Sequence, residues 1–385
     1  MPPLDLALAA KQLEEAIEHA FQKQQAVALA LQAELGRLKN LEDVVDLGIG
    51  FEKHEGRSTG RIGPVVFVGG KASSPRSAAR HRIPEFLSVG RKRYRIDVIE
   101  IAAFHPACNT GIPDDQHKTF GSVPPGVAIC AINQSGQIPP SGEGSSGAIL
   151  QIVDPHVQRA RYLLTCRHVV DQPNNWAQPW VASPVRGAWI VNSRAFDASV
   201  LEMTGYSLEI CCLGVEQKSP IKPLLGMKVM KSGAATGITG SQVSFVSPDL
   251  TVYIDNEPGV PNAGPGQVFN FIAEGDSGSV AWLGTPKDPR DPTVDPFDLG
   301  KPIDEEIERI ASGASTPDRK KEIREGLRKA FRGRAISLNV ETSNKQGIVG
   351  GPGGLPSRWA RGPAMLKVLE DLTAIRKAPV IIATN

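Results

Sequence analysis

Between His105 and Leu283 the sequence is a succession of short apolar runs separated by Gly, Pro, Asn, Asp and Ser, with almost no helical periodicity. Many short strands limited by frequent turns are typical of an all-β sandwich or barrel. This pattern restricts the fold more than any other feature of the chain. We therefore expect residues 105–285 to form a mainly β body.

The segments on either side of this body have different patterns. Leu4 to Leu38 carries apolar residues at helical spacing, which predicts one long helix or a helical pair. Thr316, Pro317 and Asp318 make a good helix start inside a densely charged stretch. We expect four units around the body: a helical segment at 1–40, a small α/β or β-rich unit at 41–104, a charged helical insertion at 286–335, and final strands with a C-terminal helix at 336–385.

Composition limits the classes of partner and compartment. With 43 Lys+Arg and 41 Asp+Glu, the net charge of +2 gives no reason to expect a nucleic-acid partner for the whole chain. A local basic stretch from Lys71 to Arg95 contains only two aromatic residues, Phe86 and Tyr94, and is interpreted as a solvated loop. No stretch is long and apolar enough to predict a membrane helix, and the first residues do not resemble a secretory signal.

The five cysteines form no C-x-x-C pair, and the seven histidines show no metal-ligand spacing. Free thiols are typical of a reducing compartment. We therefore expect a cytoplasmic protein and assign neither a metal nor a cofactor.

Three segments carry residues suited to peptide hydrolysis, which needs a nucleophile, a base, an orienting carboxylate and donors for the oxyanion. LLTCRHVV places His168 at the end of an apolar run, and AFDASVLEM places Asp197 at the start of another. EGDSGSV flanks Ser277 with glycines, which allow a sharp bend and the close approach of a substrate. We predict His168 as general base, Asp197 as orienting carboxylate and Ser277 as nucleophile.

The order His168, Asp197, Ser277 and the motif Gly275 to Ser279 resemble the trypsin-like serine peptidases, specifically a bacterial intracellular type. The segment GMKVMKSGAATGITGSQV resembles a strand-turn-strand of bacterial members. The resemblance covers roughly His105 to Leu283 and the final strands and helix. It implies a chymotrypsin-like double β-barrel, to which the N-terminal helix, the small N-terminal unit and the helical insertion would be additions.

The resemblance also implies the rest of the site. The backbone NH groups of Gly275 and Ser277 would form the oxyanion hole, and Asp276 would be a structural carboxylate beneath the loop. Phe271, six residues before Ser277, would floor the primary pocket, which predicts a preference for apolar or small side chains. The Gly-rich run that contains Gly350 and Gly351 would border the substrate cleft.

Alternatives remain for the acid and the nucleophile. Asp171 lies three residues after His168, and Asp154 precedes a loop, so either carboxylate is a candidate for the acid. Cys166 and His168 would share one face of a strand, so a thiol-imidazole pair is a second candidate nucleophile system. The sequence also lacks the disulfide framework of the secreted family members.

The sequence thus predicts a serine endopeptidase that acts on protein substrates through an acyl-enzyme. The alternative is a catalytically silent protease-like scaffold that binds protein or nucleic acid. The N-terminal helix and the insertion at 286–335 exceed what a double barrel needs, so we expect one of them to bind a regulatory protein partner.

Overall fold

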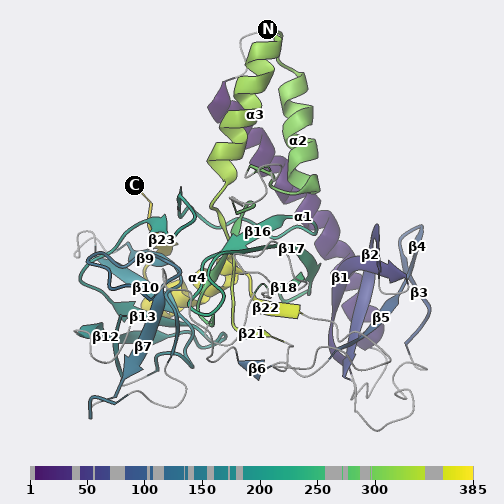
Figure 1. The fold of residues 1–385 in the computed structure, drawn as a ribbon. Helices are drawn as coiled ribbons and strands as arrows, with labels where there is room; N and C mark the ends of the chain where they lie inside the picture. Colours follow the sequence, from purple (N-terminus) through teal and green to yellow (C-terminus); the bar gives the residue numbers. More distant parts are fainter. Residues whose placement is uncertain are drawn as a thin grey trace, which may run out of the picture.

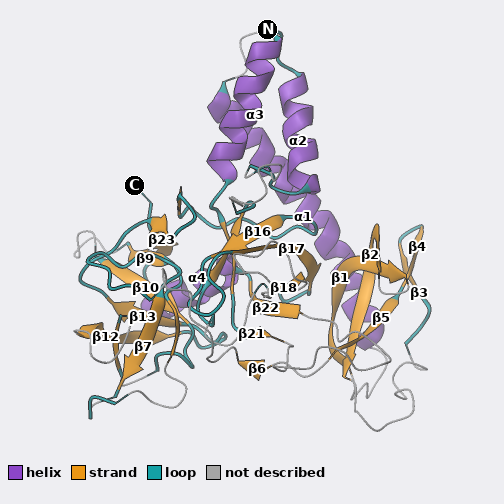
Figure 2. Ribbon diagram, viewed as in Figure 1, coloured by secondary structure: helices purple, strands orange, loops and turns teal. Residues whose placement is uncertain are grey.

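The computed structural model describes most of the chain. The described residues are 5–36, 44–54, 57–69, 83–101, 105–106, 117–133, 135–137, 143–153, 160–171, 174–178, 185–255, 271, 276–286, 295, 297–342 and 359–384. Within them the protein is mainly β, as the sequence predicts (Figure 2).

Among the described residues, one sheet has eight strands in the order β23-β9-β10-β13-β12-β11-β7-β8. The neighbours within it are antiparallel. Its strands are β7 (Ala128–Ile132), β8 (Glu143–Ser145), β9 (Ile149–Ile152), β10 (Arg161–Thr165), β11 (Asn175–Ala177), β12 (Val185–Asn192), β13 (Ser199–Glu202) and β23 (Val380–Ile382).

The other large sheet has eleven strands in the described part of the chain, eight of them in the order β20-β19-β16-β17-β18-β22-β21-β6. These are β6 (His105–Pro106), β16 (Lys228–Lys231), β17 (Thr239–Val246), β18 (Thr251–Asp255), β19 (Val280–Leu283), β20 (Ala335–Leu338), β21 (Glu341–Thr342) and β22 (Trp359–Pro363). The remaining three strands are β1 (Val44–His54), β2 (Arg57–Gly69) and β5 (Asp97–Ile101).

Those three strands belong to the predicted unit at 41–104. β1 pairs with β2 and also with β17, while β2 and β5 run parallel. The N-terminal strands therefore continue the sheet of the later β region. Two further pairs stand apart from the large sheets: β3 (Phe86–Val89) with β4 (Lys92–Arg95), and β14 (Glu209–Ile210) with β15 (Val215–Glu216).

The described helices are α1 (Leu6–Gly36), α2 (Lys301–Ser312), α3 (Pro317–Phe331) and α4 (Met365–Arg376). α2 and α3 form a hairpin beside the first part of α1, and the rest of α1 reaches β1, β2 and β3 (Figure 1). Thr316 caps α3 by accepting a hydrogen bond from the backbone NH of Arg319 at 3.2 Å. No described helix has both the length and the hydrophobicity needed to span a bilayer.

The apolar stripe of α3 faces the protein's own core. Ile323, Leu327 and Phe331 are at most 2% exposed, and they share a buried cluster with Leu13 and Ile17 of α1. This packing buries the stripe within the chain.

The basic stretch from Lys71 to Arg95 is only partly described. Its last part lies on the β3–β4 hairpin, where the exposed residues are Arg91, Lys92, Arg93 and Arg95, and its first part, residues 71–82, lies outside the described residues.

Candidate active site

His168 lies in a turn that begins directly after β10. Leu163 and Leu164 in the strand and Val169 and Val170 after the histidine are fully buried. The backbone NH groups of Val169 and Val170 both donate to Cys166 O, at 3.1 and 3.2 Å. The apolar anchors on both sides fix the turn, and the His168 side chain stays 18% exposed.

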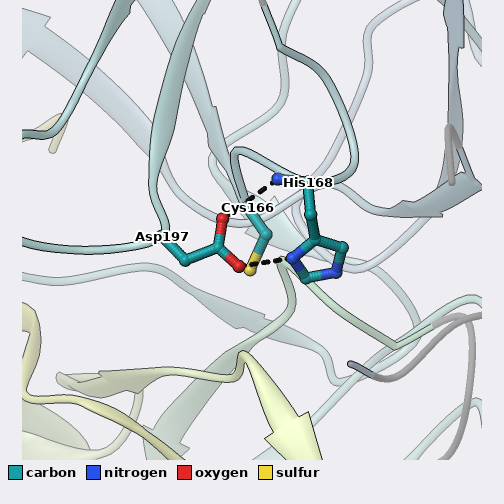
Figure 3. Close-up of side chains that lie close together, drawn as sticks. All are labelled: Cys166, His168 and Asp197. Atoms are coloured by element: carbon teal, nitrogen blue, oxygen red, sulfur yellow. Dashed lines mark hydrogen bonds and ion pairs between the residues drawn. The ribbon is translucent and has the colours of Figure 1, made fainter. Parts of the chain in front are cut away.

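Asp197 reaches His168 from the neighbouring strand. β10 pairs with β13, and Thr165 lies opposite Ser199, so the residues just beyond these two positions meet at one end of the strand pair. The backbone NH of His168 donates to Asp197 Oδ1 at 3.0 Å, and Nδ1 of its ring makes a short hydrogen bond with Oδ2 (Figure 3). Asp197 therefore holds both the backbone and the ring of His168.

The electrostatics of this pair favour an ionised carboxylate. Burial by itself raises the pKa of Asp197, but hydrogen bonds and Coulombic attraction from His168 outweigh it and leave the pKa below its ordinary value. A charged Asp197 keeps the proton of the neutral ring on Nδ1, so Nε2 is the nitrogen that can accept a proton. The contacts with Asp197 therefore fix the orientation of the His168 ring.

Asp171, the first alternative acid, has other contacts. Its Oδ1 accepts a hydrogen bond from Asn192 at 2.6 Å, and its Oδ2 lies 3.9 Å from the guanidinium of Arg167. Asp154, the second alternative, lies outside the described residues.

Ser277 is described together with the residue before it and the residues that follow. The residue is 0% exposed, and its hydroxyl donates to Val340 O at 3.2 Å. Its carbonyl accepts a hydrogen bond from Ser145 N at 2.8 Å. In this conformation the protein covers the hydroxyl.

Gly278 brings the serine segment against the strand that leads to His168. Its φ of +92° is one that side-chain-bearing residues rarely adopt, and an added Cβ would lie 2.3 Å from Thr165 Oγ1 and 2.4 Å from Ser145 O. Only glycine fits this position. Its NH donates to Asn339 O at 3.0 Å, and Cys166 Sγ contacts the same oxygen at 3.3 Å.

Gly144 makes a second close approach between the two segments. A Cβ on this residue would lie 2.6 Å from Val169 Cγ2 and 2.7 Å from Ser277 O. Val169 follows His168 directly, so β8 lies against both the histidine turn and the backbone of Ser277. The structure thus brings together the three segments on which the sequence predicts the catalytic residues.

The resemblance implies that Asp276 is a structural carboxylate, but its partner in a buried ion pair, Lys231, was not predicted from the sequence. Asp276 and Lys231 are both 0% exposed, and Lys231 Nζ lies 3.0 Å from Asp276 Oδ2. Thr236 donates to the same carboxylate through its hydroxyl at 2.6 Å and its NH at 3.2 Å. Burial lowers the pKa of Lys231 below its ordinary value, although the charge of Asp276 acts in the opposite direction.

The sequence carries a signal for the buried lysine, although not for the identity of its partner. The run GMKVMKSG interrupts an apolar strand with a lysine, and a buried lysine needs a carboxylate partner. Asp276 is that partner, so the ion pair ties the residue before Ser277 to the end of β16.

The other predicted site residues divide into two groups. Phe271 is buried at 1% exposure, its carbonyl accepts a hydrogen bond from Thr239 at 2.8 Å, and Lys231 Nζ lies 5.8 Å from its ring centre. Gly275, Gly350 and Gly351 lie outside the described residues.

No protein-family model matches the sequence, and no curated protein matches it. Among solved structures, a glutamic-acid-specific serine protease is 16% identical, with a TM-score of 0.36. Protease A of Thermobifida fusca (10%, TM-score 0.35) and a chymotrypsin of Cellulomonas bogoriensis (11%, TM-score 0.35) are similar to the same degree. In each case 68% of this chain and 100% of the other are covered. At this level of similarity, the activity of this chain has to be inferred from its own residues.

Proposed function

We propose that this protein is a trypsin-like serine endopeptidase in which Ser277, His168 and Asp197 act as the catalytic triad. One observation carries the proposal. Asp197 holds the ring and backbone of His168, and Gly278 and Gly144 allow the Ser277 segment and β8 to pack close to the turn that carries this histidine. A histidine held by a carboxylate is the arrangement that a general base requires.

In the proposed reaction, Nε2 of His168 takes the proton of the Ser277 hydroxyl while Oγ attacks the carbonyl carbon of the scissile peptide bond. The imidazolium, stabilised by Asp197, then protonates the leaving amine as the C–N bond breaks. Water hydrolyses the acyl-enzyme by the same steps and regenerates the hydroxyl. The backbone NH groups of Gly275 and Ser277 are the proposed donors to the oxyanion.

The described conformation corresponds to a closed state in this proposal. Ser277 is 0% exposed and its hydroxyl is engaged by Val340 O, so the hydroxyl has to rotate away from this carbonyl before it can react. A rotation of one side chain is fast compared with typical turnover. Access of the substrate therefore needs movement of the residues that cover the serine. In this proposal the free protein opens transiently, and a partner on α1 or on the 286–335 insertion raises the open population.

The finer features of the proposal follow the same lines. The eight-stranded sheet and the central strands of the eleven-stranded sheet are proposed as the two barrels, with the site between β10 and the segment before β19. The substrate is a protein, cleaved after an apolar or small side chain, and the compartment is the cytoplasm.

The same burial favours a second candidate function, a silent scaffold that uses the protease fold only for binding. An assay with an unfolded, fluorescently labelled protein substrate separates the two. We expect cleavage by the wild type, a loss of several orders of magnitude in Ser277→Ala and His168→Ala, and a smaller loss in Asp171→Asn than in Asp197→Asn. Cleavage that survives in Ser277→Ala, or a folded wild type that never cleaves, would favour the scaffold.

A further inference from the structure

Cys166 places a thiol beside the His168–Asp197 pair, and the proposed hydrolysis has no task for it. One ligand atom from each of these residues, a sulfur, a ring nitrogen and a carboxylate oxygen, lies within 4.8 Å of the others. Figure 3 shows the sulfur next to the carboxylate oxygen that contacts the ring. Three different donor groups from two neighbouring segments thus converge on one point.

This donor set fits one class of cation. Zinc takes thiolate, imidazole and carboxylate ligands, whereas magnesium and calcium prefer sites made of oxygen atoms alone. Three protein ligands leave the fourth tetrahedral position to water. We propose that Cys166, His168 and Asp197 form an inhibitory site for a divalent cation of the zinc class.

The charges of the site suit a buried ion. Binding replaces the proton of the Cys166 thiol with the cation, so one proton is released and a thiolate and a carboxylate together neutralise the two positive charges. The ring binds through Nδ1, and its proton moves to Nε2. A neutral complex avoids the large cost of placing a net charge in a protein interior.

The geometry needs a small adjustment. Tetrahedral bond lengths place the ligand atoms of zinc about 3.3–3.6 Å apart, which is wider than the present hydrogen bond between the ring and Asp197. The side chains of His168 and Asp197 are 18% and 31% exposed and can separate. Cys166 is fully buried, with its sulfur 3.3 Å from Asn339 O, and gives the site a fixed point.

Inhibition follows from which nitrogen of the His168 ring carries the proton. The inhibitory role rests on the proposed function, whereas binding of the cation does not depend on it. A ring that holds the cation on Nδ1 carries its proton on Nε2 and cannot accept the proton of Ser277. The cation also replaces the hydrogen bond that orients the ring. The bound protein therefore has no general base.

Binding is tested first, with Co²⁺ as a spectroscopic probe and Zn²⁺ in competition with a metallochromic dye. We expect one tight site, a cobalt–thiolate charge-transfer band, and at least about tenfold weaker Zn²⁺ binding in Cys166→Ser. Cys212→Ser is the matched control, because this exposed thiol lies 3.1 Å from Cys211 Sγ and could bind the probe at a separate place. Equal binding by the wild type and Cys166→Ser, or a band that disappears in Cys212→Ser, overturns the proposal.

Inhibition is tested with a fluorophosphonate that labels reactive serines. We expect Zn²⁺ to slow labelling of Ser277 in the wild type, a chelator to restore it, and Cys166→Ser to resist Zn²⁺ relative to its own metal-free rate. Labelling that Zn²⁺ leaves unchanged while the cobalt band is present overturns the inhibitory role. If the metal-free wild type is not labelled at all, the proposed peptidase function fails, and the cobalt band of wild type and Cys166→Ser still decides the metal site.

Discussion

At the scale of single residues, the site depends on what lies beneath Ser277. Lys231 and Asp276 are buried together, and removing one partner of such a pair leaves an uncompensated charge that costs about 3–5 kcal/mol. We predict that Lys231→Met lowers the free energy of unfolding by this amount in urea denaturation. Adding Asp276→Asn to it should recover part of the loss. A free energy of unfolding for Lys231→Met within about 1 kcal/mol of the wild-type value would contradict this role of the pair.

Gly278 allows a second prediction with a matched control. Gly278→Ala combines a positive φ with an overlap against Thr165 and Ser145, while Gly214→Ala has a positive φ of 59° and no atom within 4 Å of the new Cβ. The control should cost about 1–2 kcal/mol for its backbone conformation alone. Gly278→Ala should cost clearly more, because its neighbours have to move. Equal midpoints in thermal denaturation would show that the close approach is absent.

The residues of the candidate site differ in how far the sequence predicts them. The sequence predicts His168, Asp197 and Ser277 because each stands in a local motif, at the end or start of an apolar run or between glycines. The pairing of Lys231 with Asp276 joins positions 45 residues apart, a contact that no local pattern encodes. The place of the Cys166 thiol against the carboxylate depends on the pairing of β10 with β13 and is visible only in the structure.

At the scale of elements, a network of side-chain hydrogen bonds joins the N-terminal strands to the rest of the eleven-stranded sheet. Tyr253 on β18 donates to Asp46 of β1 at 2.5 Å, and Arg361 on β22 lies 3.4 Å from the same hydroxyl. Arg361 also binds Glu341 of β21. The contact of β1 with β17 therefore has side-chain support on an adjacent strand.

Asp46 makes this junction sensitive to pH. Burial, opposed by the hydrogen bond from Tyr253, raises the pKa of Asp46 to about 6. The folded state then binds the proton more tightly than the unfolded state, so stability falls as pH rises from about 4 to about 6, by at most roughly 2–3 kcal/mol. We predict that Asp46→Asn removes this part of the slope in denaturation at pH 4.5 and 7. The same slope in wild type and variant would exclude Asp46 as its source.

Elements made by local patterns are predicted best. The helical spacing of Leu4 to Leu38 corresponds to one continuous helix, α1, and the cap signal at Thr316 marks the start of α3. The pairing of β1 with β17 is not predictable in this way, since its two strands lie about 200 residues apart in the sequence. The local pattern of a short strand predicts the strand itself but not the distant strand with which it pairs.

At the scale of the whole molecule, α1 connects regions that lie far apart. Its first half packs with α2 and α3, while Leu31 and Leu35 near its end pack with Val66 and Val68 of β2. A partner that displaces the α2–α3 hairpin would therefore also shift the N-terminal strands, because α1 packs against both. We propose this connection as the way in which a regulatory partner acts.

This connection predicts a cooperative response to a core substitution in α1. Leu13 is fully buried, so Leu13→Ala should cost about 2–5 kcal/mol. Hydrogen exchange should then show lost protection in α2 and α3 as well as in α1. Loss confined to α1 would mean that the helices open independently.

The central claim is that Ser277 is a nucleophile activated by His168, and the rate and position of phosphonylation test it most directly. The full-length protein is treated with a fluorophosphonate, and the adduct is located by mass spectrometry of its peptides. The account predicts one adduct on Ser277 that forms far more slowly in His168→Ala and is absent in Ser277→Ala. An adduct on another residue, or labelling of Ser277 at the same rate without His168, would contradict it.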